Sequence, residues 1–74
     1  MMPKFLFADI VVVENNLIGV ILKTWINDAK QEIKYDVYVR SENCIDEFLE
    51  YEIERYRVRH KELYETELNY QNSN

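Results

Sequence analysis

The chain is poor in residues that cross-link, bend or ligate: it has one cysteine, one histidine, one glycine and one proline among 74 residues. A lone Cys44 excludes a disulfide framework within the chain. Structural zinc sites are built from several Cys or His ligands, and Cys44 and His60 are too few. The sequence therefore predicts no metal site and no cofactor, and the single thiol is typical of a reducing, cytoplasmic compartment.

A catalytic arrangement and a long apolar run are also missing. The acidic residues over 46–54 could take part in acid–base chemistry, but no nucleophile–base pair and no Gly-rich phosphate loop accompanies them. We therefore expect no catalytic residues and a protein that is not an enzyme. No apolar run reaches the roughly 18 residues that span a bilayer, and Asp9 interrupts the apolar stretch near the N-terminus. We therefore expect no signal peptide and no membrane contact.

Acidic side chains outnumber basic ones by 14 to 9, which gives a formal net charge of −5. That balance disfavours a simple electrostatic attachment to nucleic acid. The charges are unevenly placed, because every charged side chain in residues 41–54 is acidic and every charged side chain in residues 55–61 is basic. An acidic block therefore lies directly before a local basic cluster.

Three segments in the first half of the chain have the pattern of β-strands. The run Ile-Val-Val-Val favours extended backbone because its side chains branch at Cβ. Asn15 and Asn16 favour a tight hairpin turn, since Asn tolerates left-handed backbone. Gly19 indicates a bulge or a close backbone approach within a strand. The expected strands cover residues 5–13, 17–26 and 35–39, with a polar loop over 27–34.

The second half of the chain fits two structures. Over residues 44–70, apolar side chains recur near helical spacing, which favours one long helix. Alternating arginine and apolar residues over 55–59 instead favour a strand. In that second arrangement a strand at 45–49, a helical turn at 50–54 and a strand at 56–59 precede a helix at 61–70. We adopt it, with a frayed tail at 71–74 and a single domain over residues 1–74.

This pattern resembles an SH3-like small barrel, the group that includes the KOW and Tudor modules. Three stretches carry the resemblance: an acid-led strand at 9–13, a strand at 17–21 centred on Gly19, and the strand at 35–39 with the segment that ends at 53–56. The chain differs from a KOW motif in having Glu-Asn-Asn where a basic, Gly-rich loop precedes the glycine. The resemblance implies a β-barrel interaction module.

The expected fold is therefore mainly β: an SH3-like small barrel of about five short strands over residues 5–58, with a C-terminal helix. The alternative is a three-stranded antiparallel sheet packed by one long C-terminal helix. The exposed Leu and Tyr side chains of a helix at 61–70 could also form a homodimer contact.

Two groups of side chains are candidate binding sites. Trp25, Tyr35 and Tyr38 could line a groove for a peptide, because flat rings bury area at little cost in entropy. The basic side chains could form an anion-binding surface, since alternate residues of a strand lie about 6–7 Å apart along one face. That second group consists of Arg40, Arg55, Arg57, Arg59 and Lys61.

Three functions follow from these observations. The first is a non-enzymatic interaction or adaptor module that binds a protein partner through the Trp25, Tyr35 and Tyr38 groove or through its charged faces. The second is a nucleic-acid-binding accessory protein that uses the arginine cluster. The third is a small acidic regulator or inhibitor, of the kind that phages and mobile elements often encode, which docks on a basic enzyme.

Overall fold

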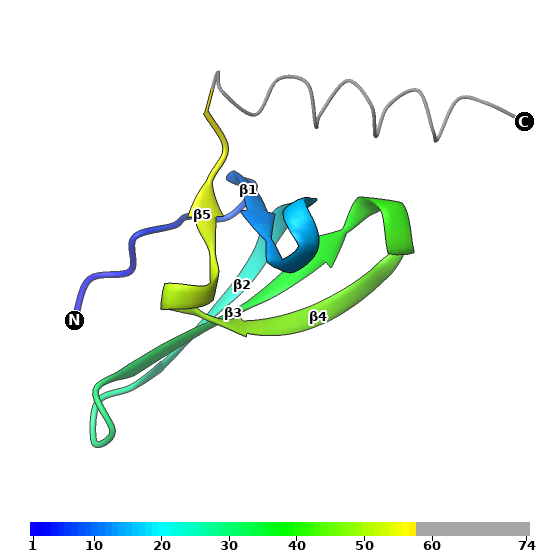
Figure 1. The fold of residues 1–74 in the computed structure, drawn as a ribbon. Coiled ribbons are helices and arrows are strands. Elements are labelled where there is room, and N and C mark those ends of the chain that lie inside the picture. Colours follow the sequence, from blue (N-terminus) through cyan, green and yellow to red (C-terminus); the bar gives the residue numbers. More distant parts are fainter. Residues whose placement is uncertain (58–74) are drawn as a thin grey trace, which may run out of the picture.

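The computed structural model describes residues 1–57, and they form one five-stranded antiparallel sheet (Figure 1). The order across the sheet is β4-β3-β2-β1-β5, so β4 and β5 are its two edges. Three single-turn 3₁₀ helices connect strands. The elements are β1 (Ile10–Val13), η1 (Glu14–Asn16), β2 (Leu17–Asn27), β3 (Glu32–Val39), η2 (Arg40–Glu42), β4 (Cys44–Leu49), η3 (Glu50–Glu52) and β5 (Glu54–Arg55). No helix among these residues is long and apolar enough to cross a membrane.

Asparagines make the turns that precede β2 and β4. Asn15 and Asn16 have φ of 62° and 59°, and they reverse the chain between β1 and β2 as the sequence predicts. Asn43, with φ 49°, ends η2 and starts β4. Asn adopts this left-handed region more readily than other residues with a Cβ, because its short polar side chain bonds locally. These turns set the register of β1 on β2 and of β3 on β4.

Gly19 and a bulge both shape β2, the longest strand. A Cβ at Gly19 would clash with Val37 Cγ1, so glycine allows β2 to pass β3 closely here. The register between β2 and β3 shifts by one residue between Ile21 and Lys23. A bulge increases local twist and bends its strand. Of the two alternatives that the sequence predicts at Gly19, the structure has the close backbone approach. The bulge lies further along β2, between Ile21 and Lys23.

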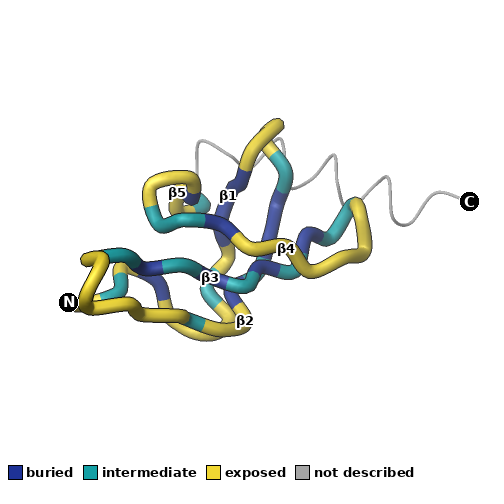
Figure 2. The backbone as a smooth tube through the Cα atoms, turned by 90° about the horizontal axis from the view of Figure 1, so that it is seen from below, coloured by how far each residue is buried: buried dark blue, intermediate teal, exposed yellow. Residues whose placement is uncertain are grey.

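The core lies on one face of the sheet, here called the inner face. Along β3, buried and half-buried residues alternate strictly, because successive side chains of a strand point to opposite faces (Figure 2). Tyr35 and Val37 of β3 are fully buried at its centre. The other inner-face members of this cluster are Phe5, Val11, Val13, Ile21, Ile33, Val39, Phe48 and Ile53. The opposite, outer face includes a second buried pair, Val12 and Ile18, which face each other across β1 and β2.

The expected closed barrel is wrong, because the described strands form one open sheet. Strand β5 has only two residues and pairs with β1, and β4 pairs with β3, so the two edges do not meet. The alternative with one long helix is also wrong, since no helix of seven or more residues occurs in the described chain. Residue Phe48 lies opposite Tyr35 in a β ladder and is buried there, which favours strand over helix in this segment.

The elements of the second half agree with the sequence in part. The strand expected at 45–49 is β4, and the helical turn expected at 50–54 is η3. The last strand of the described residues is Glu54–Arg55, where Arg55 pairs with Val11 of β1, and the predicted strand at 56–59 is described only at Tyr56 and Arg57, which lie outside any strand. The helix predicted at 61–70, the tail at 71–74 and residue 58 of the predicted barrel lie outside the described residues.

Candidate functional site

A row of apolar side chains crosses the outer face of the sheet. In register, Ile10 of β1 faces Val20 of β2, Val20 faces Tyr38 of β3, and Tyr38 faces Ile45 of β4. We call these four residues the apolar row. Its ends are open to solvent, with Ile10 42% and Ile45 62% exposed, and its two central side chains are half-buried. The Tyr38 hydroxyl donates a 2.6 Å hydrogen bond to Asn43 Oδ1, which fixes the ring.

A charged row lies beside the apolar row on the same face. Lys23 of β2 faces Asp36 of β3, and Asp36 faces Glu47 of β4. Lys34 adds two ion pairs, with 3.5 Å between its Nζ and Glu47 Oε1 and 3.6 Å to Glu32 Oε1. Exposed pairs of this kind add little stability but restrict which partner charges fit.

Trp25 lies beyond the charged row. It faces Lys34 across β2 and β3, in the hairpin arm that extends from the body of the sheet (Figure 1). The indole is 45% exposed, and the Lys23 ammonium lies 3.9 Å from the ring centroid. This cation–π contact holds the ring against the sheet surface. Trp25 and Tyr38 therefore share the outer face but do not touch, because the charged row separates them.

Tyr35 does not join the predicted groove. It lies three residues from Tyr38 on one strand, so the two rings point to opposite faces. Tyr35 is fully buried against Phe5, with ring centroids 5.4 Å apart in an edge-to-face arrangement. Its hydroxyl donates to Glu50 Oε2 at 2.5 Å and accepts from the Phe5 amide at 3.4 Å. Burial, followed by the hydrogen bond to Glu50, raises the pKa of Tyr35 to about 12.

Of the predicted anion-binding surface, the structure describes Arg40, Arg55 and Arg57. The Arg55 guanidinium donates to Asp9 Oδ2 at 3.2 Å and to the Lys4 carbonyl at 2.6 Å, and it lies over the Phe5 ring at 5.1 Å. Arg55 therefore ties the N-terminal segment to β5. Arg40 belongs to η2, which follows β3. In the sheet, β2 and β1 lie between β3 and β5. Arg57 follows β5, whereas Arg59 and Lys61 lie outside the described residues.

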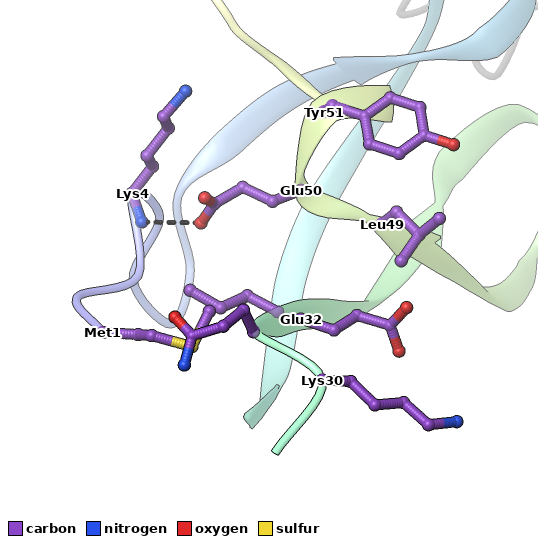
Figure 3. Close-up of a pocket in the computed structure, with 9 residues that line it drawn as sticks. Met1, Lys4, Lys30, Glu32, Leu49, Glu50 and Tyr51 are labelled. Atoms are coloured by element: carbon purple, nitrogen blue, oxygen red, sulfur yellow. Dashed lines mark hydrogen bonds between the residues drawn. The ribbon is translucent and has the colours of Figure 1, made fainter. Parts of the chain in front are cut away.

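A shallow pocket of about 340 Å³ lies beside η3 (Figure 3). Glu50 Oε2 accepts the Lys4 amide there at 3.0 Å, in addition to the Tyr35 hydroxyl. Its remaining lining is Met1, Lys30, Gln31, Glu32, Ile33, Leu49 and Tyr51. This part of the described chain offers no His, Cys, Ser or Thr at the pocket wall.

Three potential ligands gather at the start of β4. One ligand atom each from Glu42, Cys44 and Asp46 lies within 4.8 Å of the others, and the Cys44 thiol lies 3.9 Å from Glu42 Oε1. Partial desolvation and the two carboxylates raise the pKa of the Cys44 thiol. The thiol therefore stays protonated at neutral pH, which disfavours metal ligation. The cluster is a negatively charged part of the sheet edge.

Sequence reasoning identified Trp25 and Tyr38 but missed the aliphatic members of the apolar row. Ile45 falls within the segment that also fitted a helix, so its pairing with Tyr38 could not be assigned. Strand alternation could have identified Ile45: once β4 is paired with β3, every second residue of β4 lies on the same face of the sheet as Tyr38. Comparisons of the chain with protein-family models, with curated proteins and with solved structures found no match.

Proposed function

We propose that the protein is a non-enzymatic module that binds a protein partner through the outer face of its sheet. The apolar row carries this proposal, because it places four apolar side chains side by side across four strands and leaves both ends exposed. Contiguous exposed apolar surface is typical of protein–protein contacts. The aromatic Tyr38, fixed by its bond to Asn43, is an anchor that loses little entropy on binding.

The surroundings of the row suit a protein interface. The charged row and Trp25 border it on one side, so a polar rim and an aromatic side chain flank an apolar centre. Ion pairs at a rim select partners by charge more than they add affinity. The partner surface is therefore expected to be apolar opposite Tyr38 and Ile45 and charged opposite Lys23 and Glu47.

The test compares two single substitutions of exposed apolar residues. Ile45→Ser removes one end of the apolar row, and Tyr51→Ser removes an 82% exposed ring on η3, away from the row. Both sites are exposed, so each variant is expected to stay within about 0.5 kcal/mol of the original stability. Circular dichroism and urea unfolding check this before binding is compared.

Binding is then measured by quantitative mass spectrometry of proteins captured on the immobilised full chain from cells that express it. The expected result is one or more proteins enriched by the unmodified chain and by Tyr51→Ser, and lost with Ile45→Ser. Equal recovery by all three forms would contradict the proposal. So would a capture that never exceeds that of the bare support.

A further inference from the structure

Strand β4 presents a free edge of backbone groups. It is the outermost strand on its side, and no strand pairs with its far edge within residues 1–57. The Leu49 amide donates to Glu52 Oε1 at 2.8 Å, so it points away from β3. Backbone groups alternate in direction along a strand, and those of Glu47 and Ile45 therefore point the same way as those of Leu49. The amides and carbonyls of Ile45 and Glu47 are thus available to another strand.

The charge along this edge selects what can pair with it. Glu42 and Asp46 have no cation partner in the described chain, and Glu47 shares Lys34 with Glu32. All residues from Cys44 to Glu47 are exposed (Figure 2). A second copy of β4 paired antiparallel about Asp46 or Glu47 would place that carboxylate opposite its own copy, and like charges directly opposite are destabilising. The edge therefore disfavours self-pairing and complements a basic strand.

We propose that the edge of β4 accepts an extended basic segment of a partner protein as an added strand. The partner backbone pairs with Ile45 and Glu47, since these residues point their amides and carbonyls outward. Side chains on an added strand alternate between faces. Because Ile45 and Glu47 share the outer face and Asp46 faces the other way, an apolar side chain then lies beside Ile45 and extends the apolar row, while a cationic side chain lies beside Asp46. This inference rests on the proposed function and names its partner class.

Amide hydrogen exchange on the full chain tests the added strand. The probe is the capped peptide acetyl-Lys-Val-Lys-Val-Lys-Val-amide, which is basic and extended. At a peptide concentration of about ten times Kd, exchange of the Ile45 and Glu47 amides is expected to slow about tenfold. The Cys44, Asp46 and Phe48 amides point toward β3 and serve as internal controls, with little change expected. Unchanged exchange at Ile45 and Glu47 under saturating peptide would overturn the proposal.

Two peptide controls separate backbone pairing from charge. The same peptide with Glu in place of every Lys should give no protection, because the edge repels it. A peptide with N-methyl groups on its valines keeps the charge and loses the donors, so it should bind weakly and leave Ile45 and Glu47 unprotected. Equal protection by the acidic peptide would overturn the requirement for a basic partner. Equal protection by the N-methylated peptide would overturn strand addition.

Protein variants complete the test. Glu42→Gln with Asp46→Asn removes the two carboxylates that lack a cation partner, and peptide affinity should fall at least about threefold. The control Glu14→Gln removes a charge from η1, away from β4, and it should leave the affinity unchanged. An equal loss of peptide affinity in both variants would contradict a specific role for the carboxylates beside β4. If Ile45→Ser loses the captured partner while the peptide never protects β4, the proposed function stands and the strand addition fails.

Discussion

The Tyr35 hydroxyl donates a 2.5 Å hydrogen bond to Glu50 Oε2 and so joins the centre of β3 to η3. The same carboxylate oxygen accepts the Lys4 amide, and the Tyr35 oxygen accepts the Phe5 amide. One buried phenol and one carboxylate therefore attach the N-terminal segment and the turn after β4 to the core. This contact organises the side of the molecule opposite the proposed binding face.

Tyr35→Phe is expected to lower the free energy of unfolding by about 1–3 kcal/mol, because it leaves the Phe5 amide without its acceptor and removes one of the two donors to Glu50 Oε2. Urea unfolding measures the change. Tyr38→Phe is the matched control, since it removes a hydroxyl that bonds Asn43 at an exposed position. Its expected cost is about 0.5 kcal/mol. A cost for Tyr38→Phe as large as that for Tyr35→Phe would contradict this account.

Alkaline pH should weaken the fold through Tyr35. Its pKa is about 12 in the folded chain, against an ordinary value of 10.0. Between these values the unfolded chain releases the phenol proton and the folded chain retains it, so the free energy of unfolding falls as pH rises. Below pH 10 both states hold the proton, and Tyr35 adds no pH dependence. Urea unfolding from pH 8 to 12 should show a smaller decline in Tyr35→Phe, and parallel curves for the two proteins would refute the assignment.

Arg55→Ala should destabilise the chain by about 1–2 kcal/mol, because the guanidinium bonds Asp9 and the Lys4 carbonyl and packs on Phe5. Thermal unfolding followed by circular dichroism provides the measurement. Lys30→Ala removes the same charge from the turn between β2 and β3 and is expected to be nearly neutral. Equal stability of the two variants would mean that Arg55 does not connect the N-terminal segment to β5.

Gly19→Ala should cost about 2 kcal/mol or more, because the added methyl would clash with Val37 Cγ1 and lie 3.2 Å from the Tyr38 carbonyl oxygen. Val37→Ala alone leaves a cavity in the core and should cost about 2 kcal/mol. In the double variant the smaller side chain makes room for the methyl. The double variant should therefore lose at least about 0.5 kcal/mol less than the sum, and simple additivity would contradict a direct clash.

Local chemistry along the sequence determined which segments extend and where the chain turns. The β-branched run before Glu14, the Asn15-Asn16 turn and the close approach at Gly19 follow from side-chain shape and from the left-handed backbone that Asn tolerates. Composition likewise indicated a mainly β chain with few ligands for a metal. These features depend on neighbours within a few residues, so the sequence alone carries them.

Only the tertiary structure decided closure, register and which side chains meet. The two-residue β5 pairs only with β1, so the sheet stays open at that edge. The same pairing brings Arg55 into an ion pair with Asp9 within the chain. Register placed Tyr35 in the core and brought Ile45 beside Tyr38. A shift of one residue would exchange the two faces, and no local preference fixes it. Long-range packing around Tyr35 and Gly19 supplied that constraint, and with it the composition of the outer face.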